Sequence, residues 1–233
     1  MKYKIVELRK PNYLNGRETF TIIEFIVDFS SEDKELLEKI KIQIEEMNTN
    51  KKNTSGEIRD EITLIKDKYL GIMSEKILTV FLNKHFEEKN IPFRAINEKF
   101  VNYDKHVDII IKDLRDTNKN YKIEVRGSYP YKSKEETIWR NLSILGPYTT
   151  SYKSEEVEKD FYFFVFINCK KEEFDLKTKH SIYFAGGASL ELFKKIGKIQ
   201  SLKQDGADYR TIKPISLGYD SLEILKKIGE KSL

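Results

Sequence analysis

Cysteine and histidine are nearly missing from this sequence, which has one cysteine and three histidines in 233 residues. The single thiol, Cys169, excludes an internal disulfide framework and a zinc site built on thiolates. Three histidines are too few for a metal cage unless carboxylates contribute ligands as well. A metal site in this chain would therefore depend on aspartate and glutamate.

Long apolar runs are also missing. The longest apolar stretch, residues 161–167, has only the length of a strand, whereas a membrane helix needs about 20 apolar residues. The first residues lead into an alternating pattern and not into the apolar core of a signal peptide. We therefore expect a soluble, cytoplasmic protein.

The charge balance has little excess of one sign. Lysine and arginine number 42 against 38 aspartates and glutamates, which gives a net charge of +4. Only a local concentration of charge could therefore indicate a nucleic-acid partner. An apolar fraction of 39% with 12% aromatic residues supports a hydrophobic core and argues against disorder. The length fits one large domain, or a core with a smaller appendage.

The N-terminal part predicts strands followed by a helix. β-branched and aromatic residues are enriched at the strand positions, and a Ser-Ser-Glu-Asp sequence can cap the helix. We expect strands at 4–8 and 20–29, and a helix over 30–47. Residues 48–56 contain no apolar side chain and mark a boundary. This divides the chain into an N-terminal extension, 1–56, and a core with a C-terminal segment, 57–233.

The remainder of the chain predicts one long helix and then short strands interleaved with helices, which is typical of an α/β or α+β fold. The long helix is expected over 57–89, because apolar residues recur there at steps of three and four. These positions are Ile58, Ile62, Ile65, Tyr69, Ile72, Met73, Ile77, Val80 and Phe81. Strands are expected at 93–96, 107–112, 121–127, 160–169 and 182–184, and helices at 189–195 and 221–229. Gly186 and Gly187 are interpreted as a turn that enters the first of these two helices.

A charged strand face is predicted in the middle of the chain, shortly after an acidic residue that precedes an apolar run. Side chains alternate along a strand, so Lys122, Glu124 and Arg126 share one face while the apolar residues between them enter the core. On the preceding strand, Asp108 stands before three isoleucines, where burial of a carboxylate is costly without compensation. A divalent cation shared by Asp108 and Glu124 would supply that compensation, and Mg²⁺ prefers such oxygen ligands.

These residues resemble the PD-(D/E)XK nuclease superfamily, to which most type II restriction endonucleases belong. The resemblance is carried by an acidic residue, a hairpin, and the pattern hydrophobic-Glu-hydrophobic-basic over 123–126. The sequence GIMSE at 71–75 is similar to the family's preceding helix, and DFYFFV at 160–165 to its following buried strand. The likeness covers roughly 57–184. It implies a restriction-endonuclease-like mixed central sheet flanked by helices, with an N-terminal strand and helix extension.

Carried over to this chain, the resemblance implies that Asp108, Glu124, the backbone carbonyl of Val125, and Glu75 as a further ligand hold Mg²⁺. Arg126 takes the position of the family lysine. Because arginine stays protonated, it can hold a phosphate or position water but cannot act as a general base. Lys122, on the same face, is the alternative for the lysine function. A second departure is that His106-Val107 stands where the motif has a proline.

The implied function is sequence-specific cleavage of double-stranded DNA by a Mg²⁺-activated water, as in a type II restriction enzyme. Such an enzyme would act as a homodimer, because a palindromic site mirrors a two-fold axis. A cognate DNA methyltransferase in the same system is a further implied partner.

Two segments carry basic residues that suit contacts with DNA. Basic residues outnumber acidic ones six to three over 119–140, where aromatic side chains are interleaved, and again over 186–213. The candidates for DNA contact are Lys132, Lys134, Arg140, Lys198, Lys203, Gln204 and Arg210. A solvated charged surface is the competing interpretation of both segments.

Other functions remain open from the residues. A structure-selective nuclease for repair or DNA junctions would share the same chemistry. A catalytically weakened DNA-binding module is suggested by arginine in the position of the lysine. The hairpin could also be a surface element of an unrelated α+β structural protein, with cross-strand ion pairs in place of a site.

Overall fold

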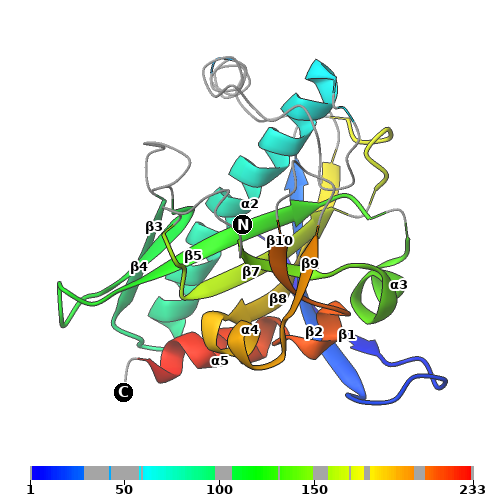
Figure 1. The fold of residues 1–233 in the computed structure, drawn as a ribbon. Coiled ribbons are helices and arrows are strands. Elements are labelled where there is room, and N and C mark those ends of the chain that lie inside the picture. Colours follow the sequence, from blue (N-terminus) through cyan, green and yellow to red (C-terminus); the bar gives the residue numbers. More distant parts are fainter. Residues whose placement is uncertain are drawn as a thin grey trace.

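A seven-stranded mixed sheet forms the centre of the molecule (Figure 1). The structure is a computed structural model, and it describes residues 2–28, 42, 58, 60–97, 107–130, 132–148, 157–167, 169–175, 179–201 and 208–231. The strand order is β1-β2-β8-β7-β5-β4-β3. The bounds are β1 Tyr3–Arg9, β2 Thr19–Asp28, β3 Phe93–Asn97, β4 Ile109–Asp113, β5 Asn120–Ser128, β7 Phe161–Ile167 and β8 Lys179–Ser189. The α/β class expected from the sequence is confirmed.

The pairing within the sheet is antiparallel except between β5 and β7. β4 and β5 form the expected hairpin, with Ile109 opposite Ile123. The strand expected at 182–184 is longer than predicted, since β8 continues to Ser189. All seven residues of β7 are buried, because both faces of the sheet are covered at this strand.

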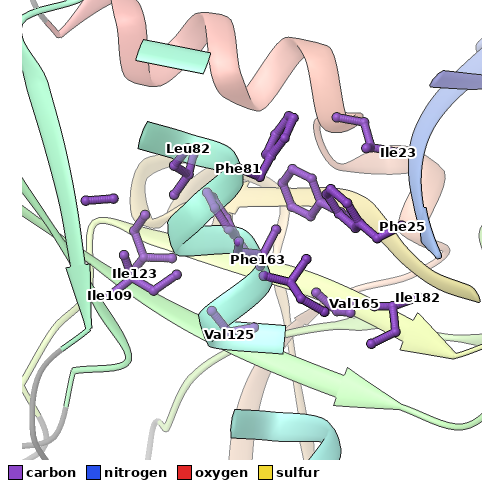
Figure 2. Close-up of a cluster of buried hydrophobic side chains, with 14 of the residues drawn as sticks. Ile23, Phe25, Phe81, Leu82, Ile109, Ile123, Val125, Phe163, Val165 and Ile182 are labelled. Carbon is purple, nitrogen blue, oxygen red and sulfur yellow. The ribbon is translucent and has the colours of Figure 1, made fainter. Parts of the chain in front are cut away.

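The long helix α2, Glu61–Glu88, covers one face of the sheet together with α5, Ser221–Glu230 (Figures 1 and 2). α2 begins four residues later than predicted. The Asp60 carboxylate caps it by accepting a hydrogen bond from the Thr63 backbone N–H at 2.7 Å. Three residues expected on its apolar face or just before it, Ile58, Ile62 and Val80, are instead 56–77% exposed.

The expected N-terminal strands pair with each other as predicted, and β2 also pairs with β8. Ile23 and Phe25 of β2 pack in the same core as Phe81 of α2 and Phe163 of β7 (Figure 2). Strands β1 and β2 therefore belong to the same sheet as the β4–β5 hairpin. The helix expected at 30–47 and the boundary near residue 56 lie outside the described residues, apart from single positions.

A smaller layer covers the opposite face of the sheet. Its described part contains a three-stranded sheet, β6-β10-β9, and four short helices. Their bounds are β6 Ile144–Tyr148, β9 Lys198–Ser201, β10 Asp208–Ile212, α3 Lys134–Glu136, η2 Thr137–Asn141, α4 Leu190–Ile196 and η4 Ile215–Leu217. Trp139, Phe164 and Phe193 lie in the second core beneath this layer. Of these elements only α4 was predicted from the sequence.

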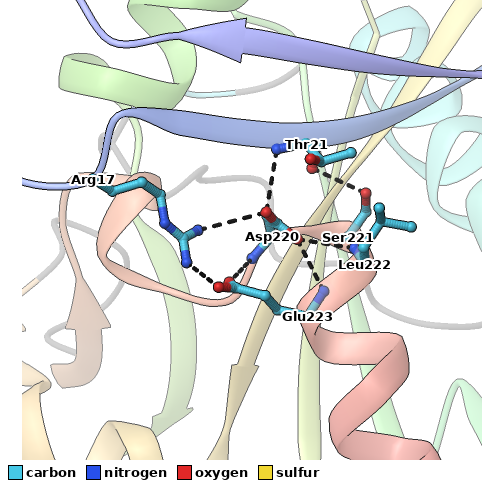
Figure 3. A network of polar contacts seen from close by, with 6 residues as sticks. All are labelled: Arg17, Thr21, Asp220, Ser221, Leu222 and Glu223. Atoms are coloured by element: carbon cyan, nitrogen blue, oxygen red, sulfur yellow. Dashed lines mark hydrogen bonds and ion pairs between the residues drawn. The ribbon is translucent and has the colours of Figure 1, made fainter.

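Asp220 ties the start of α5 to β2 and to the β1–β2 loop (Figure 3). Its carboxylate caps the helix by accepting hydrogen bonds from the N–H groups of Leu222 and Glu223 at 3.0 and 2.9 Å. It also accepts a bond from the Thr21 N–H at 3.3 Å. Arg17 forms ion pairs with both Asp220 and Glu223. This junction holds α5 against the N-terminal strands.

The outer edge of β3 is covered by a side chain of α2. The Asn83 amide donates a hydrogen bond to the Ala95 carbonyl at 2.9 Å and accepts one from the Ala95 N–H at 2.8 Å. The Phe93 N–H is also satisfied internally, by the Ile91 carbonyl. The backbone groups that β3 would otherwise present to another strand are therefore partly occupied.

Gly186 and Gly187 lie within β8, so their interpretation as a helix-entry turn was wrong. Gly186 has a φ of +80°, which a residue with a side chain rarely adopts. A Cβ atom on Gly187 would stand 2.0 Å from the Tyr162 carbonyl oxygen. The pair allows the Tyr219 segment, which forms a bridge to Gly187, to approach the sheet closely.

Candidate functional site

The predicted site residues of the hairpin lie at the start of β4 and on the adjacent part of β5. Asp108 immediately precedes β4, and continuing the β4–β5 register by one residue sets it opposite Glu124. The Asp108 carboxylate accepts a hydrogen bond from the Val125 N–H at 2.6 Å. Its own carbonyl accepts one from the Asn97 amide of β3 at 3.2 Å. Asp108 is only 7% exposed.

Glu124 and Arg126 point toward the smaller layer. In the parallel β5–β7 pairing they stand opposite Tyr162 and Phe164, which belong to the core on that face. Lys122 precedes them on the same side, as the alternation predicts. The intervening Ile123 and Val125 pack on the α2 side. The distribution of this strand over two faces is therefore as expected.

Two cations hold the Glu124 carboxylate. The Arg126 guanidinium lies 2.9 Å from one oxygen, and the Lys159 ammonium lies 3.5 Å from the other. The Lys159 side chain is 2% exposed and the Glu124 side chain 12%. A lysine buried to this extent requires a negative partner, since an unpaired charge is costly away from water.

Lys159 reaches this place because the start of β7 is tied to β5. The next residue, Asp160, donates its N–H to the Lys122 carbonyl and accepts the Lys122 N–H on its carboxylate, both at 2.8 Å. Sequence reasoning missed Lys159. It lies 35 residues after Glu124 in the chain, so only the tertiary pairing of the two strands brings them together.

α2 contributes Glu75 and Lys68, which lie about two turns apart on the helix. Burial raises the pKa of Glu75 well above its ordinary value, and the nearby charges of Asp108 and Glu124 raise it further. Burial lowers the pKa of Lys68, while Glu75 and Asp108 oppose that shift. The predicted carboxylates therefore share one electrostatic environment. Lys68 is, after Lys159, a second residue of this charged cluster that sequence reasoning missed.

The donor chemistry of this cluster suits a hard cation, because it offers three carboxylates and the Val125 carbonyl. The side chains are nevertheless not arranged as a ready metal site. Within the residues that the structure describes, no group of three or more His, Cys, Asp or Glu side chains is placed to hold an ion. Glu124 is instead neutralised by Arg126 and Lys159. Metal binding would require Glu124 to exchange these partners.

The described candidates for DNA contact lie on elements of the smaller layer or on the chain leading into it. Lys132, Arg140 and Lys198 are exposed, and Lys134 and Arg210 are half-buried. Arg140 stacks on the ring of Tyr13 at 4.1 Å from its centre. Glu124 and Arg126 point to this same side of the central sheet. Lys203, Gln204 and His106 lie outside the described residues.

The chain belongs to the same family as a protein of Methanocaldococcus jannaschii named "Uncharacterized protein MJECS01". The two sequences are 32% identical over 217 residues, an alignment that covers 78% of this chain and 76% of the relative. No protein-family model matches the chain, and no solved structure matches it. Among the described residues, no helix is long and apolar enough to cross a membrane.

Proposed function

We propose that this protein is a Mg²⁺-dependent endodeoxyribonuclease of the PD-(D/E)XK type, acting as a type II restriction enzyme. The observation that carries the proposal is the placement of Asp108 opposite Glu124 on the β4–β5 hairpin, with the Asp108 carboxylate accepting the Val125 N–H. The charges of both residues also raise the pKa of Glu75 of α2. A buried carboxyl group whose pKa is strongly raised, as that of Glu75 is, is a common feature of functional sites.

In this proposal Asp108, Glu124, the Val125 carbonyl and Glu75 hold the metal ion. A bound Mg²⁺ would supply a water of lowered pKa and would polarise the phosphate. Arg126 and the buried Lys159 would bind phosphate oxygens, since both are cations placed at the same carboxylate. Lys159 replaces Lys122 as our preferred substitute for the family lysine, because its ammonium reaches Glu124.

We further propose that duplex DNA lies on the side of the smaller layer, toward which Glu124 points. The basic residues of α3, η2, β9 and β10 would contact its backbone. A homodimer, a cognate methyltransferase and a cytoplasmic location complete the proposal. They follow from the resemblance to restriction enzymes.

Incubation of the purified protein with mixed-sequence DNA tests the function. We expect discrete fragments in the presence of Mg²⁺, and none in EDTA. Glu124→Gln should abolish cleavage. Glu230→Gln, which changes an exposed glutamate of α5, is the matched control and should cut normally. A Glu124→Gln variant that still cuts would exclude this site.

A second candidate is a DNA-binding module without activity, and the ion pair between Glu124 and Arg126 favours it. Such a protein would bind DNA at low salt, where electrostatic attraction is strongest, but would not cut it with any divalent ion. Cleavage confined to branched DNA would instead indicate a structure-selective nuclease.

A further inference from the structure

The ion-pair chain Arg126–Glu124–Lys159 has a charge arrangement that opposes metal binding. Its central carboxylate is a proposed metal ligand, and each of its oxygens faces a cation. A divalent ion placed there would meet two positive groups, one of them almost fully buried. Like charges at such short range repel strongly in a weakly polar environment.

A DNA phosphate would remove this obstacle. Arginine and lysine both bind phosphate strongly. A phosphate oxygen is negatively charged, so it can replace the Glu124 carboxylate as their partner. Lys159 could release Glu124 because the phosphate would supply an anion in place of the carboxylate. Glu124 would then be available to a cation that the phosphate itself also attracts.

We propose that Arg126 and Lys159 exchange the Glu124 carboxylate for a phosphate of bound DNA, so that DNA and the divalent ion bind cooperatively. This inference depends on the proposed function and adds an order of binding to it. Without DNA, Arg126 and Lys159 occupy the Glu124 carboxylate and oppose binding of the metal ion. Lys159 is the central residue of the exchange because its side chain is only 2% exposed and its ammonium faces the Glu124 carboxylate. No covalent bond changes in this step.

Thermodynamic linkage makes the proposal measurable from both sides. If DNA raises the affinity for the ion by a certain factor, the ion must raise the affinity for DNA by the same factor. We suggest Ca²⁺ as the probe ion, titrated by calorimetry with and without a short mixed-sequence duplex. Fluorescence anisotropy of the labelled duplex, with and without Ca²⁺, gives the reciprocal value. We expect a factor of about ten or more, since couplings between sites are commonly 5–150-fold.

Two variants test the role of the cations. Lys159→Met and Arg126→Gln should each tighten Ca²⁺ binding in the absence of DNA and reduce the coupling factor. Because Lys159 is buried, its variant is first checked for folding by circular dichroism. If it does not fold, Arg126→Gln decides alone, since the Arg126 side chain is 29% exposed. Lys4→Met is the matched control: it removes a lysine that lies 2.8 Å from the buried Glu24, and it should leave the factor unchanged.

The outcomes separate this inference from the proposed function. Equal Ca²⁺ affinity with and without DNA in a protein that cuts DNA would overturn the exchange and leave the nuclease assignment in place. An unchanged coupling factor in the folded variants would also overturn it. A protein that neither binds nor cuts DNA would overturn both proposals.

Discussion

Replacement of Asp220 by alanine should destabilise the protein by about 2–3 kcal/mol. Loss of an aspartate cap costs about 1 kcal/mol, and here the carboxylate accepts two N–H groups of α5. A further hydrogen bond to a charged acceptor, from Thr21, contributes about 1 kcal/mol at its length of 3.3 Å. The Arg17 side chain is 27% exposed, so its ion pair at 3.8 Å adds less than about 1 kcal/mol.

Equilibrium unfolding in urea, followed by the fluorescence of the single Trp139, measures this loss. Asp220→Asn is the matched control, because asparagine caps helices about as well as aspartate but lacks the charge. We expect it to lose about 1 kcal/mol or less. An alanine variant within about 0.5 kcal/mol of the wild type would refute the view that this junction holds α5 on β2.

Three further predictions concern the site, the core and the DNA surface. The ordinary pKa of Glu75 is 4.5, and its pKa in the folded protein is raised well above that value. Between these two pKa values the folded state binds more protons than the unfolded state. The free energy of unfolding therefore falls as pH rises through this interval. Glu75→Gln should therefore stabilise the protein in EDTA at neutral pH and give no gain below about pH 4.5, as thermal melts across pH would show. Phe163→Ala should cost about 3–5 kcal/mol in urea unfolding, since this ring is fully buried between α2 and the sheet; a loss below about 1 kcal/mol would contradict that packing. Lys198→Ala and Arg210→Ala should each lower the salt dependence of DNA binding by about one unit of slope, and an unchanged slope would remove that residue from the DNA surface.

The strands of the central sheet were largely predictable, because their signal is local. Apolar and β-branched residues mark β2, β4, β5 and β7, and the turn residues at 113–120 mark the hairpin. The smaller sheet was not predicted. β6 contains Gly146-Pro147, and β9 is exposed at every position, so neither shows an apolar pattern. The face of α2 was partly wrong because apolar residues surround this helix on more than one side.

The site was predictable only where one strand or one motif determines it. Alternation places Glu124 and Arg126 on one face, and the hairpin brings Asp108 opposite Glu124. Lys159 and Lys68 gave no signal, because their positions depend on the pairing of β5 with β7 and on how α2 lies across the sheet. Whether the cluster holds a metal ion and cuts DNA stays a prediction.

The Asn83 amide limits how molecules of this protein could join through their sheets. It occupies the outward backbone groups of Ala95, so a neighbouring molecule cannot readily extend the sheet beyond β3. Extension of the central sheet by strand addition is therefore favoured at β1 over β3. Two molecules joined edge to edge at β1 would have β3, with its partly occupied backbone, at both outer ends of the combined sheet, which disfavours further extension of that sheet.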